Sequence, residues 1–66
     1  MGDAEIWQTI VKADELLKYA TEEKAEVRRD QAVTLLRTAL VDAEAAGSAP
    51  LAEQARTRLR DLGLDD

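Results

Sequence analysis

The apolar positions between residues 30 and 47 recur with the period of an α-helix. Small or aliphatic side chains follow one another at steps of four and three, at Ala32, Leu36, Ala39, Ala43 and Ala46. This spacing places them on one face of a helix, and Val33 and Leu40 widen that face. Gly47 stands where helices commonly end in a left-handed residue. The pattern predicts a helix over about residues 23–46, against which the rest of the chain packs.

A second stripe indicates an earlier helix over about residues 4–20. Its members are Ile6, Ile10, Ala13, Leu17 and Ala20. Asp3 precedes the stripe and is predicted to cap the helix with its side-chain oxygen. Trp7 and Val11 lie about 120° from the centre of the stripe in an ideal helix. This second strip predicts that the helix touches two neighbours, as a helix in a three-helix bundle does.

The joint at Thr21–Arg29 contains neither Gly nor Pro, so its turn is weakly marked. Thr21 can cap the next helix, with acidic residues in the first turn. Alternatively, the break falls nearer Arg29 and Asp30 is the cap. A single uninterrupted helix would leave both apolar faces in water, so two helices are expected.

A third helix is predicted over about residues 50–62. Pro50 suits a first helical turn, and the apolar stripe, about 100° wide, contains Leu51, Ala52, Ala55, Leu59 and Leu62. Gly63 followed by Leu64 is typical of a Schellman end, in which Leu64 folds back onto Leu59.

Short connections make successive helices antiparallel neighbours. The sequence therefore predicts an all-α fold, a small up-down-up three-helix bundle that forms one domain over residues 1–66. Trp7 should then be partly buried against a layer of small residues, because large side chains interdigitate with small ones. The small residues of that layer are Ala43, Ala45, Ala46, Ala49 and Ala52.

Composition narrows the function. The 66 residues carry a net charge of −5 and contain no Cys and no His. An acidic domain repels nucleic acid, and no stretch approaches the length of about 20 apolar residues that spans a membrane. Without cysteine there is no disulfide framework, which favours a soluble cytoplasmic protein.

The sequence offers little chemistry. The absence of His and Cys removes the usual nucleophile–base pairs and the nitrogen or sulfur metal ligands. Glu22, Glu26 and Asp30 line one helical face and could hold a hard cation through oxygen atoms, but solvated acids paired with Lys24 or Arg29 are the ordinary explanation. No enzyme activity and no cofactor are expected.

The arginines form two groups, Arg28, Arg29 and Arg37 in the second helix and Arg56, Arg58 and Arg60 in the third. We interpret them as salt-bridged solvated faces. In the third helix, Arg56 and Arg60 share a face with Glu53, and Arg58 lies nearer Asp61.

Ala32, Leu36 and Ala39 resemble the small-large-small signature in the second helix of a tetratricopeptide repeat. Leu16 and Ala20 would be the packing residues of its first helix, and GSAPLAEQARTRLRDLGL is similar to the closing helix of such proteins. The resemblance covers mainly residues 13–64 and has room for one repeat. It implies a helical hairpin plus a third helix, serving protein interaction without catalysis.

A weaker strip on the back of the second helix is the candidate partner-binding site. It consists of Val27, Thr34, Thr38 and Val41. The narrow third helix cannot cover both faces of the second, so we expect the strip to be exposed and to contact a second copy or another protein. The alternative is that these are surface residues without a role.

The sequence thus favours a non-catalytic protein-interaction or oligomerisation module. The alternatives are a bundle that caps or supports a larger helical protein, and an acidic regulatory protein.

Overall fold

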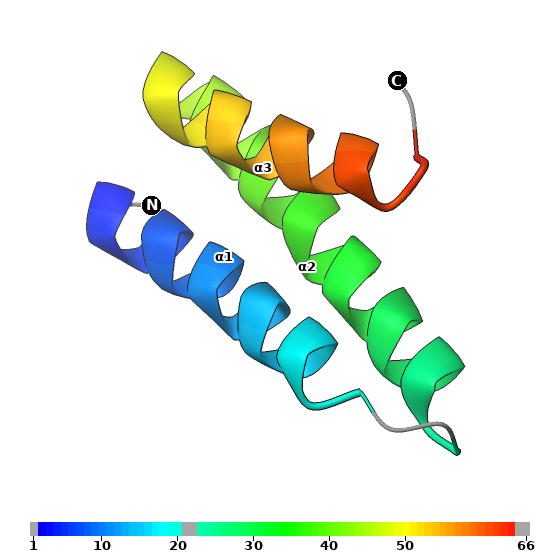
Figure 1. Ribbon diagram of the computed structural model, residues 1–66. Helices are drawn as coiled ribbons and strands as arrows, with labels where there is room; N and C mark the ends of the chain where they lie inside the picture. The colour runs from blue at the N-terminus through cyan, green and yellow to red at the C-terminus, as the bar shows by residue number, and fades with distance from the viewer. Residues whose placement is uncertain (1, 21–22, 65–66) are drawn as a thin grey trace.

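The computed structural model describes residues 2–20 and 23–64. In these residues it contains three helices and no strand: α1 (Asp3–Lys18), α2 (Ala25–Ala45) and α3 (Ala49–Asp61). Figure 1 shows α1 and α3 running antiparallel to α2, and both helices pack mainly on α2 and much less on each other. The predicted all-α, three-helix fold is confirmed.

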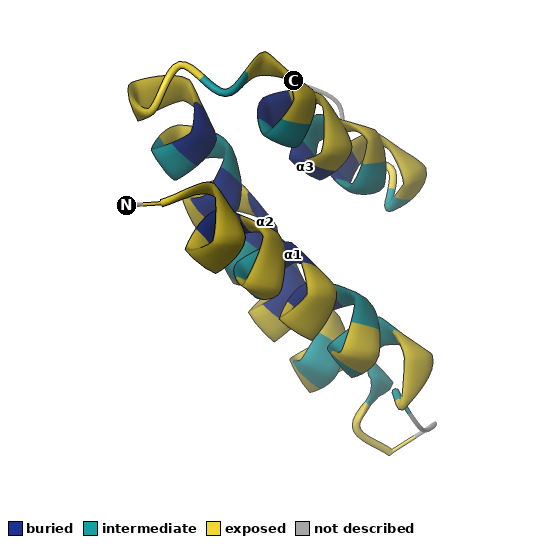
Figure 2. Cartoon of the chain, turned by 90° about the vertical axis from the view of Figure 1, so that its left-hand side faces the viewer, coloured by how far each residue is buried: buried dark blue, intermediate teal, exposed yellow. Residues whose placement is uncertain are grey.

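The core lies on the sides of the helices that face one another (Figure 2). Its buried residues are Ile6, Ile10, Ala13, Ala32, Leu36, Ala39, Ala43, Ala52, Ala55 and Leu59. Most of them are alanines, which let helix axes approach to the short end of the usual range of about 8–10 Å. Partly buried leucines, such as Leu16, Leu40 and Leu62, pack around this centre. Few large side chains are therefore fully buried, and each matters to stability.

Both predicted glycine helix ends are present. Gly47 and Gly63 have φ values of 73° and 81°. At the end of α3, the amide of Leu64 donates to the Leu59 carbonyl (3.0 Å) and the amide of Gly63 donates to the Arg60 carbonyl (2.9 Å). This pair of bonds is the Schellman motif. The end of α2 repeats it, with the Ser48 amide donating to the Ala43 carbonyl at 2.8 Å.

The helix starts differ from the prediction. Asp3 is the first residue of α1 rather than its cap, because the Gly2 carbonyl already accepts from the amides of Glu5 and Ile6. The Asp3 carboxylate therefore lies in the first turn, where the helix dipole favours negative charge. Asp30 lies inside α2, so the break near Arg29 is wrong. Thr21 lies outside the described residues.

The helix bounds differ slightly from the predicted ranges, and these differences leave the topology unchanged. α1 ends at Lys18 and α2 begins at Ala25, each within about two residues of the sequence estimate, as expected for frayed helix ends. Pro50 lies in the first turn of α3, which begins at Ala49. None of the helices within residues 2–20 and 23–64 has the length and apolar character needed to cross a bilayer.

Candidate interaction surfaces

The outer strip of α2, which we define as Val27, Thr34, Thr38 and Val41, is exposed along its whole length. The two valines keep 58% and 63% of their surface accessible. Thr34 lies about 160° around the helix from the buried Leu36, so the strip is on the side opposite the core. α1 and α3 pack mainly on the other side, and α1 borders the strip at its centre, where Thr34 lines a hollow with Lys12 and Leu16 of α1. Its role in binding a partner stays a prediction.

The end of the outer strip nearest α3 is slightly hollowed. Arg37, Thr38, Val41 and Asp42 line a shallow depression on α2. The cationic Arg37 and the anionic Asp42 lie on opposite edges of the strip, given the 100° step of a helix. An apolar side chain entering this hollow would meet Val41 and would have one charge of each sign beside it.

The other end of the outer strip repeats this arrangement with the signs exchanged. Val27 has Lys24 three residues before it and Asp30 three residues after it, again on opposite edges. Among residues 2–20 and 23–64, the ion pairs formed within the chain involve neither of these side chains nor those of Arg37 and Asp42. The edge that carries Lys24 and Asp42 was missed by the sequence reasoning, although helical geometry alone could have identified it.

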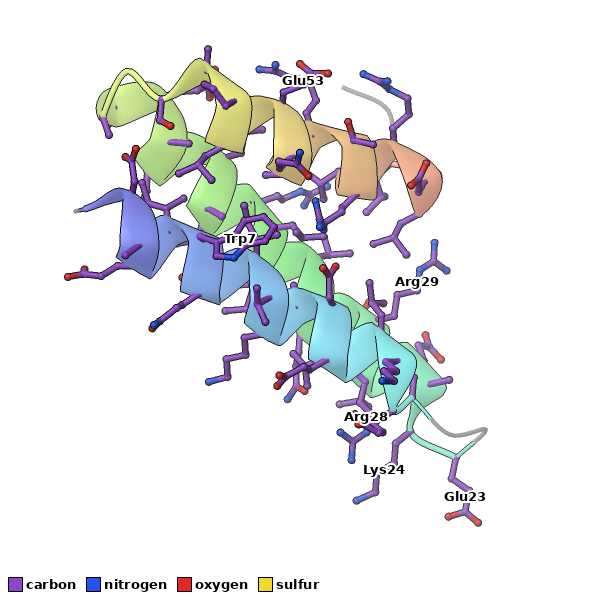
Figure 3. All side chains as sticks on the ribbon, turned by 60° about the vertical axis from the view of Figure 1, so that its left-hand side comes forward. Trp7, Glu23, Lys24, Arg28, Arg29 and Glu53 are labelled. Carbon is purple, nitrogen blue, oxygen red and sulfur yellow. The ribbon has the colours of Figure 1, made fainter. Side chains whose placement is uncertain are left out.

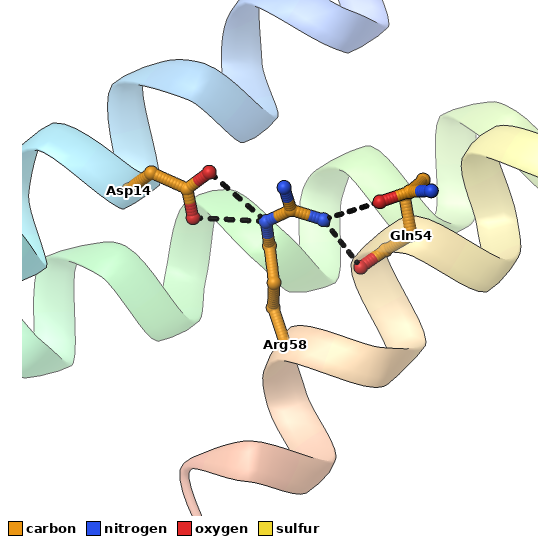
Figure 4. A network of polar contacts seen from close by, with 3 residues as sticks. All are labelled: Asp14, Gln54 and Arg58. Atoms are coloured by element: carbon orange, nitrogen blue, oxygen red, sulfur yellow. Dashed lines mark hydrogen bonds and ion pairs between the residues drawn. The ribbon is translucent and has the colours of Figure 1, made fainter.

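A second surface feature, the α1–α3 seam, consists of the exposed apolar Trp7 and the polar side chains of Asp14, Gln54 and Arg58. The Arg58 guanidinium lies over the Trp7 ring, 5.7 Å from its centroid. Its Nε donates to both carboxylate oxygens of Asp14 at 2.8 and 3.0 Å, and one terminal nitrogen donates to the side chain and carbonyl of Gln54 (Figure 4). Among the described residues, the ion-pair partner of Arg58 is Asp14 of α1 rather than Asp61 of its own helix.

Trp7 is more exposed than the sequence suggested. It lies between α1 and α3 (Figure 3) and keeps 43% of its surface accessible. Of the five alanines expected opposite it, Ala43 and Ala52 are buried, whereas Ala45, Ala46 and Ala49 are exposed. The reason is that α1 contacts α3 far less than it contacts α2, so no continuous alanine layer closes over the ring.

Two other arginines bind elements distant in sequence. A terminal nitrogen of Arg29 donates to the Leu62 carbonyl at 2.6 Å, which ties the start of α2 to the end of α3. Arg56 pairs with Glu44 of α2 at 3.5 Å and with Glu53 of its own helix at 3.6 Å. These contacts are exposed, so each stabilises the fold modestly.

Arg28 turns toward α1 rather than toward the outer strip. With Leu16 and Tyr19 it lines a hollow between α1 and α2. Its Nε is buried, and within the described part of the chain it has no hydrogen-bond partner. Arg28 is therefore unavailable to a molecule bound on the outer strip.

Two of the three carboxylates considered as a possible cation site lie within the described residues. Glu26 and Asp30 are exposed on α2, and Glu22 lies outside the described residues. Among the residues that the structure describes, no three His, Cys, Asp or Glu side chains are grouped so that they could hold a metal ion.

No protein-family model, curated protein or solved structure matches this chain. The resemblance to a tetratricopeptide repeat consequently stays a prediction, and the two exposed surfaces have to be judged from their own geometry.

Proposed function

We propose that the protein is a non-catalytic interaction module that binds an α-helix of another protein molecule along the outer strip of α2. The observation that carries the proposal is the exposure of Val27 and Val41, at 58% and 63%, on the helix face opposite the core. Exposed apolar rows bordered by charge are a common form of protein-binding surface. The net charge of −5 disfavours nucleic acid as the partner, and the lack of cysteine favours the cytoplasm.

The spacing of the outer strip suits a helical partner. Steps of seven, four and three residues place its members along one seam, as at helix–helix contacts. The Thr34 hydroxyl donates to the Asp30 carbonyl of its own helix at 3.1 Å, which satisfies the polar group and leaves the methyl group free to pack. The charges on the two edges would then discriminate between partners.

Site-specific photo-crosslinking in cells tests this function. A photoreactive amino acid replaces Thr38 in the strip and, as the matched control, the exposed Thr57 of α3. We expect a defined crosslinked protein product from position 38 that position 57 does not give, and the double variant V27E/V41E should remove it. Equal crosslinking from both positions would overturn the proposal.

A further inference from the structure

We propose that the helix received by the outer strip is the same strip of a second copy of this chain, paired antiparallel about a two-fold axis that passes Thr34. This inference rests on the proposed function and names the partner. Val27 and Val41 each lie seven residues from Thr34. A two-fold rotation at Thr34 therefore sets Val27 of one copy against Val41 of the other, and the symmetry repeats that contact.

Each edge of the outer strip contains one pair of opposite charges that meet under this rotation. When two helices pack antiparallel about such an axis, each edge faces the same edge of the second copy. One edge carries Glu26, Asp30, Arg37 and Glu44. The rotation brings the opposite charges of Asp30 and Arg37 to within about 1.5 Å of each other along the helix axis. It also sets Glu26 about 3 Å from Glu44 along the axis, a like-charged pair that opposes the contact and is offset in part by the ion pair of Glu44 with Arg56. The other edge carries Lys24 and Asp42, which come within about 3 Å along the axis.

The hollow near Val41 then acquires an occupant. Val27 of the second copy would enter it, with the Asp30 carboxylate of that copy beside Arg37 and its Lys24 ammonium beside Asp42. None of these four charges is engaged in an ion pair within the described residues. Pairing across the interface therefore breaks no ion pair among residues 2–20 and 23–64.

A parallel arrangement fits less well. It would bring each edge against the opposite edge, so that Arg37 meets Asp42 and Asp30 meets Lys24. These pairs would be offset by five or six residues, or about 7.5–9 Å along the axis. Parallel packing also sets the two helix dipoles side by side in the same direction, whereas antiparallel packing opposes them.

The contact is small, and the association is expected to be weak. Each copy contributes two valines and two threonines, far fewer than the roughly 20–30 residues per side of a standard interface. We expect a dissociation constant on the order of 0.1 mM. Sedimentation equilibrium should show the average molar mass rising between micromolar and millimolar concentrations, and a monomer throughout that range would overturn the inference.

Cysteine crosslinking tests the direction of pairing, because the natural chain contains no cysteine. V27C and V41C are mixed in equal amounts, one of them isotope-labelled, and oxidised at millimolar concentration. Random pairing would make the mixed disulfide dimer equal in amount to the two like-chain dimers combined, so antiparallel pairing predicts a mixed dimer that clearly exceeds their sum, as read by mass spectrometry. A preponderance of like-chain dimers indicates parallel pairing and overturns the inference, as does a yield no greater than that of T57C.

Charge exchange on one edge tests the register. D30R places two cations together and should weaken association about tenfold, whereas D30R/R37D restores the opposite pair and should return association to the natural level. In a parallel dimer, the double variant would set like charges together on both pairs and would bind more weakly than the single variant. V11E, at an exposed valine of α1, is the matched control and should associate as the natural chain does.

The two proposals fail in different ways. A purified chain that stays monomeric, together with a strip-specific crosslink to another protein in cells, overturns self-pairing and leaves the interaction module standing. Absence of both self-association and strip-specific crosslinks overturns both proposals. Association that survives V27E/V41E, with unfolding unchanged, would locate the dimer contact elsewhere and overturn the inference.

Discussion

The α1–α3 seam and the outer strip of α2 both expose large apolar side chains, but they differ in what lies over them. In the seam, Arg58 covers part of the Trp7 ring and is itself held by Asp14 and Gln54. In the outer strip, Val27 and Val41 are more exposed than Trp7, and no described side chain from α1 or α3 packs over them.

The comparison separates two reasons for exposure. In the seam, the exposed ring is contacted by a side chain of the same molecule, because a cation with its own hydrogen-bond partners can lie on an aromatic face at little cost. The outer strip has charges on both edges but none that folds over the valines. Exposure in the seam is therefore explained by the fold, whereas exposure of the strip is what the proposed contact between molecules would explain.

The largest predicted effect is a difference in the free energy of unfolding between substitutions on the two faces of α2. Leu36→Ala removes the largest buried side chain of that helix and should cost about 2–5 kcal/mol of unfolding free energy. Val41→Ala, on the opposite face, should change it by less than about 0.5 kcal/mol. Urea unfolding followed by circular dichroism measures both. A comparable loss in the two variants would show that the strip is packed within the monomer.

The next effect concerns the end of α3, which carries Arg58 and the Leu62 carbonyl bound by Arg29. Gly63→Val should cost about 1 kcal/mol or more, because a β-branched residue is strained at a φ of 81°. A Cβ at this position would meet no atom within 4 Å, so the cost comes from the backbone alone. Gly63→Asn, which tolerates this conformation, should cost less, and equal losses would contradict the cap.

These local features could be predicted from sequence, whereas the seam could not. Helix faces follow from the 3.6-residue period, and the ends at Gly47 and Gly63 follow from glycine's freedom at positive φ. The pairing of Arg58 with Asp14 joins residues 44 positions apart and depends on the register of α3 against α1. The exposure of Trp7 depends on how little these two helices touch, and periodicity within each helix does not determine that.

A smaller effect tests whether Trp7 and Arg58 act together. In a double-mutant cycle, Trp7→Ala and Arg58→Ala should show a coupling of about 0.5–1 kcal/mol, the size expected for an exposed cation–π pair. The cycle of Val41→Ala, on the outer strip of α2, with Arg58→Ala is the control and should show none beyond error. Arg58→Ala should also shift the Trp7 fluorescence to longer wavelength. Zero coupling would mean that the ring and the guanidinium are merely adjacent.

The smallest change in stability, with a clear change in association, is expected from strengthening the outer strip. T34V/T38V replaces two hydroxyls with methyl groups and makes the strip apolar from Val27 to Val41. Val and Thr have similar helix propensities, and the Thr34 hydroxyl bonds only its own helix. The free energy of unfolding of the monomer should therefore move by less than about 0.5 kcal/mol.

Burial of the added methyl groups between two copies should tighten self-association several-fold, because each buried methylene is worth about 0.8 kcal/mol. Sedimentation at matched concentrations measures the gain, and the same substitution at Thr57 of α3 is the control. Stronger association from both sites would indicate general stickiness, whereas a gain from the strip alone would show that this face, unlike the seam, is completed by a second molecule.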